Sequence, residues 1–90
     1  MIDNERNAAE IFKALSDENR LKILEFLVNG ERCVCEIFPH IGSSQSNVSQ
    51  HLKVLRNAGL IDFRKNGKKI IYYLTSPEVI ELLKCVDRIH

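Results

Sequence analysis

The chain has 90 residues, which is enough for one domain, and we expect residues 1–90 to fold as a single unit. Hydrophobic residues make up 44% of the chain and charged residues 28%, a balance typical of a globular protein. No apolar run approaches the ~20 residues that cross a bilayer, and the first residues lack the basic and apolar regions of a secretory signal. These features exclude a two-domain enzyme and predict a cytoplasmic protein that does not enter the membrane.

Positive charge is concentrated in one segment of the chain. Residues 43–69 hold six basic side chains and a single acid, Asp62, whereas residues 1–42 and 70–90 each carry a net negative charge. A local concentration of positive charge is typical of a surface that binds phosphates. A solvated basic face is the alternative interpretation.

Apolar periodicity predicts two helices in the first third of the chain. The first is expected over residues 7–15. The second begins after a polar cap at Ser16-Asp17, carries a broad apolar stripe, and ends at Asn29-Gly30, where glycine can adopt the left-handed conformation. We expect this second helix to form the centre of the core.

A helix-turn-helix is predicted in the middle of the chain. A weaker helical segment spans residues 31–38 and meets Pro39, whose ring opposes its continuation. Gly42 then marks a turn, and a further helix with an apolar stripe is expected to end near residues 57–59. Two short helices joined by a tight turn that contains glycine are typical of this motif.

A β-hairpin is predicted around Asn66-Gly67, because this dipeptide is the most favoured in two-residue type I′ turns. Residues 60–65 and 68–74 would form its strands. Counting outward from the turn places like charges opposite each other at two positions, Lys65 with Lys68 and Arg64 with Lys69. Such pairs cost stability, and an anion lying against the hairpin tip would explain them.

The last helix is expected to begin at Ser76-Pro77-Glu78, which combines a capping side chain, a proline at the first helical position and an acid at the positive end of the helix dipole. The chain as a whole is therefore predicted to be mainly α with one β-hairpin. The expected fold is a winged helix-turn-helix with about five helices and a two-stranded wing.

The helix before the hairpin has an outward face of hydrogen-bonding side chains. An ordinary solvated face would hold more Glu and Lys and fewer Ser and Asn, which are poor helix formers. Ser and Gln can bond base edges or phosphates, so this face favours a helix that reads the DNA major groove. With the cations of the hairpin, the candidate DNA-binding residues are Gln45, Ser46, Asn47, Ser49, Gln50, Lys53, Arg64, Lys65, Lys68 and Lys69. His51, at the edge of the apolar stripe, is expected to be structural.

Four segments carry a family resemblance. They are Leu15-Ser16-Asp17 with Arg20-Leu21-Lys22-Ile23-Leu24; Ser44-Gln45-Ser46-Asn47-Val48-Ser49-Gln50-His51-Leu52-Lys53-Val54-Leu55; Ala58-Gly59-Leu60-Ile61; and Gly67-Lys68-Lys69 leading to Tyr73-Leu74. In this order they resemble the ArsR/SmtB family of winged-helix repressors. The resemblance implies a homodimer that binds a palindromic double-stranded DNA operator. It also implies release by a metal, a metalloid or another signal, and a hairpin that serves as the DNA-contacting wing.

The segment Glu31-Arg32-Cys33-Val34-Cys35-Glu36 resembles the Cys-Val-Cys-acidic box of thiolate-sensing members of this family. Soft thiolates would select arsenite, antimonite, cadmium, lead or zinc as an inducer, with no permanent cofactor. In a regular helix, residues two apart point about 200° away from each other. If Cys33 and Cys35 share one ion, we therefore expect the helix that supports the recognition helix to distort, which would weaken DNA binding.

The box departs from the arsenic-type version, in which a third cysteine stands at the position of Phe38. Cys85 is the candidate third ligand, provided that folding or dimer contact brings it near.

Three other interpretations of the cysteines and of the fold stay open. Cys33 and Cys35 could be small, half-buried apolar residues without a ligand, or thiols of a redox-responsive regulator. The winged helix could instead be a protein-interaction module, which a salt-dependent DNA titration would distinguish. No catalytic constellation is visible, so we do not expect an enzyme.

Overall fold

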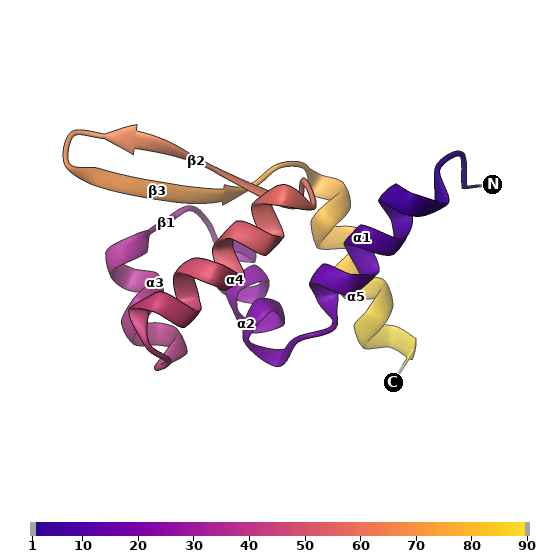
Figure 1. Cartoon of the computed structure of the whole chain (residues 1–90), viewed down its shortest axis with the longest axis horizontal. Coiled ribbons are helices and arrows are strands. Elements are labelled where there is room, and N and C mark those ends of the chain that lie inside the picture. Colours follow the sequence, from indigo (N-terminus) through magenta and orange to yellow (C-terminus); the bar gives the residue numbers. More distant parts are fainter. Residues whose placement is uncertain (1, 90) are drawn as a thin grey trace.

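A computed structural model describes residues 2–89. In this range the elements follow in the order α1 (Glu5–Leu15), α2 (Glu18–Val28), β1 (Arg32–Cys33), α3 (Val34–Ile41), α4 (Gln45–Asn57), β2 (Ile61–Asn66), β3 (Lys69–Leu74) and α5 (Pro77–Ile89). Figure 1 shows the hairpin of β2 and β3 projecting to one side above the helices. Every helix within residues 2–89 falls short of the length and apolar character that crossing a membrane requires.

Helix α2 lies at the centre of the core, as its apolar stripe predicts. Ile23 and Leu24 of this helix have no exposed surface. Helices α1, α3 and α4 all contact α2, and α5 closes the same cluster through Val79. Burial of each such large side chain contributes about 1.5–3 kcal/mol, so α2 is the support on which the other helices are placed.

Polar side chains cap three of the helices, one of them at the predicted Ser16-Asp17. Asn4 Oδ1 accepts the N–H of Asn7 at the start of α1, which therefore begins at Glu5, two residues earlier than predicted. Asp17 begins α2 in the same way, and Ser44 begins α4. These caps satisfy N–H groups that have no partner inside the helix.

The prediction of a helix over residues 31–38 is wrong at both ends. Arg32 and Cys33 form the strand β1, which pairs antiparallel with β3. Helix α3 begins only at Val34 and continues past Pro39 to Ile41. Pro39 lacks an N–H, so α3 loses one hydrogen bond at this position. The helix continues past Pro39 for only two more residues, to Ile41, so the loss is confined to its last turn. The edge of β3 supplies backbone partners for β1, which the local sequence cannot reveal.

The predicted register of the hairpin is also wrong. Asn66 pairs with Lys69, so the turn consists of Gly67 and Lys68. Gly67 has a φ of 64° and Lys68 has no positive φ, which fits a type II′ turn and not the predicted type I′. The observed partners of the basic residues are apolar, Arg64 with Ile71 and Lys65 with Ile70. The like-charge pairs are therefore not a feature of this hairpin, and they give no reason of their own to place an anion at its tip.

A cross-strand aromatic pair accounts for the observed register. Phe63 lies opposite Tyr72, and their rings stack with centroids 5.5 Å apart. Aromatic pairs directly opposite each other stabilise a sheet by about 0.2–1 kcal/mol. The observed register gains this contact and avoids the two like-charge pairs of the predicted register, which favours it over the type I′ alternative.

Asp17, Arg20 and His51 form a polar network that joins α1, α2 and α4. Arg20 Nε donates to the carbonyl of Ala14 at 2.7 Å, and its Nη1 lies 3.3 Å from His51 Nδ1. His51 Nε2 lies 3.9 Å from Asp17 Oδ1. The expectation that His51 has a structural role agrees with these contacts.

The same network lowers the pKa of Asp17. Burial raises this pKa, but the N–H of Arg20, the charges of His51 and Arg20 and the N–H of Asn19 outweigh it. A carboxyl whose native pKa is depressed stabilises the fold above its unfolded pKa and loses this contribution as the pH falls through the native value.

We expect Asp17→Asn to remove part of the acid sensitivity of folding. Asn can still cap the helix, so the change in the pH dependence of stability reports the loss of the Asp17 charge alone. Thermal melts of the parent should show stability falling below the ordinary Asp pKa of 3.8, and the variant should show a shallower fall. Asp17→Ala should also lose the cap and be less stable by about 0.5–2 kcal/mol at neutral pH. The exposed Asp3→Asn variant is the control, and an unchanged profile in Asp17→Asn would refute the role of the network.

Candidate DNA-binding surface and thiol pair

Helix α4 has one face in the core and one face in solvent. Val48, Leu52 and Leu55 are buried and hold the helix against α2. The six candidate DNA-binding residues of this helix are all exposed, namely Gln45, Ser46, Asn47, Ser49, Gln50 and Lys53. A helix that is fixed on one side and covered with donors and acceptors on the other can contact base edges and phosphates.

Asn47 also helps to organise the start of α4. Its backbone N–H donates to Ser44 Oγ at 3.1 Å, and its side-chain Nδ2 donates to Ser43 Oγ at 3.2 Å. These bonds hold the turn between α3 and α4 in place. Asn47 therefore has a structural role in addition to its predicted contact with DNA.

The wing presents Lys65, Lys68 and Lys69 as exposed cations near its tip. Arg64, the fourth predicted cation, is held by Glu31: Nη2 donates to Glu31 Oε1 at 2.7 Å, and Nη1 donates to Oε2. The hydrogen bond with Glu31 raises the pKa of Arg64, and the same bond lowers the pKa of Glu31. Three lysines are thus available to phosphates, whereas the charge of Arg64 is neutralised within the chain.

Arg56 joins the end of α4 to the base of the wing. Its Nε donates to Asp62 Oδ1 at 3.1 Å, and its guanidinium lies 4.4 Å from the centroid of the Phe63 ring. The N–H of Phe63 and, after it, the hydrogen bond from Arg56 lower the pKa of Asp62. Sequence reasoning did not find this link, although Asp62 is the one acid among the basic residues 43–69.

Cys33 and Cys35 lie side by side where β1 meets α3. Their Cα atoms are 5.1 Å apart and their sulfur atoms are joined as a disulfide. Cys33 is buried and caps α3: its sulfur accepts the N–H of Cys35 at 3.1 Å, and its own N–H donates to Glu36 Oε1. The expectation that a regular helix holds the two sulfurs apart is wrong, because Cys33 precedes the helix in an extended conformation.

Cys33 and Cys35, called here the thiol pair, would supply two soft donors to an ion once their disulfide is reduced. Within residues 2–89 no group of three His, Cys, Asp or Glu side chains has an arrangement that could hold a metal ion, so Cys85 does not complete the pair inside one chain. Cys85 is exposed on α5, where Arg88 Nη2 donates to its sulfur at 3.2 Å. A two-sulfur site fits a thiophilic ion, and a third protein donor would have to come from a rearrangement or a second chain.

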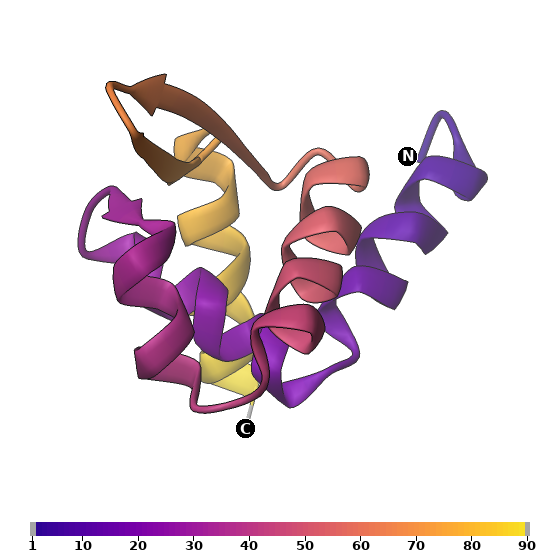
Figure 2. The ribbon, with the colours of Figure 1, turned by 60° about the vertical axis from the view of Figure 1, so that its left-hand side comes forward.

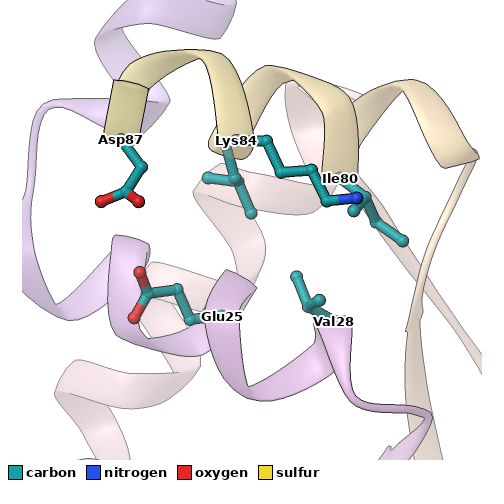
Figure 3. A pocket seen from close by; sticks show the side chains of 6 residues that line it. Glu25, Val28, Ile80, Lys84 and Asp87 are labelled. Atoms are coloured by element: carbon teal, nitrogen blue, oxygen red, sulfur yellow. The ribbon is translucent and has the colours of Figure 1, made fainter. Parts of the chain in front are cut away.

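A pocket of about 240 Å³ lies between α2 and α5. Figure 3 shows the carboxylates of Glu25 and Asp87 pointing toward one another across it, while Lys84 extends away from them. Val28 and Ile80 form part of its apolar lining. Among residues 2–89, these two carboxylates do not belong to any group of three His, Cys, Asp or Glu side chains that could hold a metal ion.

The sequence profile of bacterial regulatory proteins of the arsR family matches residues 17–62, which span α2, the turn and α4. This chain belongs to the arsR family. The family and its named relatives are transcriptional regulators, which agrees with the expectation that the chain is not an enzyme.

Three curated relatives are similar to this chain over most of its length. An uncharacterised HTH-type transcriptional regulator of Methanocaldococcus jannaschii is 40% identical over 98% of this chain and 100% of its own length. A homologue of the cadmium resistance regulator CadC from Staphylococcus aureus is 42% identical over 90% of this chain and 68% of its own. A probable mercury resistance operon repressor of Streptomyces lividans is 43% identical over 83% of this chain, which spans 60% of that protein.

Two solved structures confirm the winged helix-turn-helix fold. Rv0081 of Mycobacterium tuberculosis is similar with a TM-score of 0.89, at 37% identity, covering 99% of this chain and 90% of that one. A homodimeric winged helix-turn-helix DNA-binding domain of Mycobacterium bovis is similar with a TM-score of 0.88, at 29% identity, covering 99% and 86%.

We expect Lys68→Ala/Lys69→Ala to weaken binding to specific and random duplexes alike. Each lost phosphate contact should flatten the log–log dependence of affinity on salt by about one unit. Gln50→Ala should mainly reduce discrimination between sequences, because it removes a side chain able to bond base edges. Fluorescence anisotropy at several salt concentrations measures both effects. Lys22→Ala/Lys84→Ala is the charge-matched control, and an unchanged slope in the wing variant would remove the wing from the interface.

Proposed function

We propose that this arsR-family chain is a homodimeric repressor that binds a palindromic operator and leaves it when a thiophilic metal or metalloid binds Cys33 and Cys35. The observation that carries the proposal is the position of the thiol pair. Cys33 caps α3, the first helix of the helix-turn-helix, and pairs with Ile71 of the wing. A ligand on its sulfur therefore acts on both parts of the DNA-binding surface.

DNA recognition is divided between α4 and the wing. Ser46, Ser49 and Gln50 offer hydrogen bonds to base edges, and Lys53 offers a charge to the backbone. Lys65, Lys68 and Lys69 add phosphate or minor-groove contacts beside the same site. Arg56 holds the two parts in one arrangement through Asp62 and Phe63, so they approach the duplex together.

The dimer is supported by apolar side chains that the chain leaves in solvent. Phe12 on α1 is 60% exposed, and Val86 and Ile89 on α5 are 48% and 86% exposed. A second copy related by a two-fold axis would cover them. Two recognition helices one DNA turn apart also require such a pair of chains.

The inducer is an ion that prefers sulfur ligands, of the class of arsenite, antimonite, cadmium, lead or zinc. The ion binds the reduced form, in which a thiol reductant has supplied two electrons and two protons to the disulfide, and each thiol gives up its proton to the solvent as the ion binds. A thiolate that coordinates such an ion can no longer serve as a normal cap for α3. The start of α3 would then rearrange, and with it the support of α4. Cys85 is the proposed third donor where the ion demands three.

A second candidate function is redox sensing, and the Cys33–Cys35 disulfide favours it. Two thiols become one S–S bond as two electrons and two protons pass to an oxidant such as a peroxide. The same two residues and the same structural junction would then carry the signal without an ion.

We expect Cys33→Ser and Cys35→Ser each to bind DNA normally and to resist release by an added ion. Operator titrations of reduced protein with arsenite, cadmium, lead and zinc, added separately, would identify the inducer. Release should correspond to a coupling on the order of 1–3 kcal/mol.

The Cys85→Ser variant tests the number of ligands. Normal release would show that two sulfurs suffice, whereas a weaker response would show that Cys85 is the third donor. If the Cys33→Ser/Cys35→Ser double variant leaves DNA at the same ion concentration as the parent, the sensor lies elsewhere.

We expect sedimentation at micromolar concentration to show a dimer. Phe12→Ala and Ile89→Ala should shift the population toward the monomer and weaken operator binding, because both remove apolar contact area. Ile2→Ala, which also removes an exposed apolar side chain, serves as a control outside α1 and α5. A monomer that binds the palindrome as tightly as the parent would overturn the dimer.

A further inference from the structure

The thiol pair is built into the sheet that forms the wing. The strands lie in the order β1-β3-β2, and Ile71 of β3 pairs with Cys33 on one side and with Arg64 on the other. Cys33, Ile71 and Arg64 therefore occupy one row across the sheet. Figures 1 and 2 both show β1 beside the wing, between the hairpin and α3.

A charged side-chain bridge starts from Arg64 in this row and crosses β3 diagonally to Glu31. The guanidinium of Arg64 crosses β3, 5.9 Å from the centroid of the Tyr73 ring, and makes two hydrogen bonds with Glu31. Glu31 comes directly before β1 and two residues before Cys33. A shift of the backbone at Cys33 is thus transmitted to the carboxylate that holds Arg64.

Arg64 has two competing partners of the same chemistry. A carboxylate and a phosphate both accept paired hydrogen bonds from a guanidinium. Arg64 lies on the wing one residue from Lys65, so without Glu31 it would add a cation to those of the wing tip. In the structure, where the two sulfurs are joined, Glu31 holds it.

We propose that Glu31 is a positioning residue that links the state of the thiol pair to the wing. Bridging of the two sulfurs keeps Arg64 on Glu31 and away from DNA phosphate. Separation of the thiols shifts β1, weakens the grip of Glu31 and lets Arg64 contact the duplex. This inference rests on the proposed function and adds a second route to it, because the signal reaches DNA through the wing as well as through α3.

The test compares reduced and oxidised protein, so it needs no knowledge of the natural inducer. All variants carry Cys85→Ser, which leaves Cys33 and Cys35 as the only thiols. Diamide takes up two electrons and two protons as the S–S bond forms, and dithiothreitol reverses the step. Operator affinity is measured over a range of salt concentrations for both forms.

In the parent, the reduced form should bind about tenfold more tightly and show a salt slope steeper by about one unit for each Arg64 that gains a phosphate. In Glu31→Gln the two slopes should coincide and the ratio of affinities should fall below about threefold. Arg64→Gln should also abolish the difference in slope, and the double variant should show no further loss, because the pair acts as a unit.

Glu81→Gln is the matched control, since it removes another exposed acid that pairs with a basic side chain, Lys84 on α5. It should keep the parental ratio and slopes. The inference is overturned if Glu31→Gln behaves like the parent, if Glu81→Gln loses the difference as well, or if the parent itself shows none. Failure of the ion-release proposal is seen separately, in the titration of the Cys33→Ser/Cys35→Ser variant.

Discussion

Strand β3 is hydrogen-bonded on both edges, and the arrangement of the DNA-binding surface depends on this constraint. Its pairing with β2 forms the wing, and its pairing with β1 ties the wing to the start of α3. The wing is therefore the outer part of a sheet whose other edge carries Cys33. A strand held on two sides cannot move without changing either the hairpin or the first helix of the helix-turn-helix.

The support beneath this surface is a small apolar core with charged connections at its edge. α2 places α3 and α4, and Asp17, Arg20 and His51 fasten α4 to the chain that precedes it. On the opposite side, Arg56 fastens α4 to β2. Helix α4 is thus held by polar contacts of His51 and Arg56 in addition to its buried apolar residues. These contacts keep its polar face in one orientation.

The longer helices could be predicted from the sequence because their signals are local. Apolar spacing and capping residues indicate α2, α4 and α5, and the structure places all ten candidate DNA-binding side chains in solvent. β1 could not be predicted, because its partner Tyr72 lies far along the chain and two residues carry no periodicity. The predicted register of the hairpin was wrong for a related reason. It was derived from the turn preference of Asn66-Gly67 alone, whereas the Phe63–Tyr72 contact is made between the two strands.

The role of individual charges was equally hidden from a linear inspection of the sequence. Arg64 is basic like Lys65 and Lys68, yet only the fold shows that it pairs with the carboxylate of Glu31, which directly precedes β1. Asp62, an isolated acid in a basic segment, belongs to the join between α4 and the wing. Charge counts locate a basic segment, but which of its cations are paired within the chain depends on the folded structure.

The two sulfurs differ in their access to solvent, and this difference sets an order of events. Cys33, in β1, is 5% exposed, whereas Cys35, in the first turn of α3, is an exposed residue. In the reduced protein, an incoming ion or electrophile therefore meets the Cys35 thiol first and reaches the Cys33 thiol second. A small reagent that can bind two sulfurs would react with Cys35 and then with Cys33. A bulky reagent that can bind only one sulfur would react with Cys35 alone. The unequal exposure of the two sulfurs would therefore select among reagents by their size and by the number of sulfurs they can bind, independently of how strongly they bind sulfur.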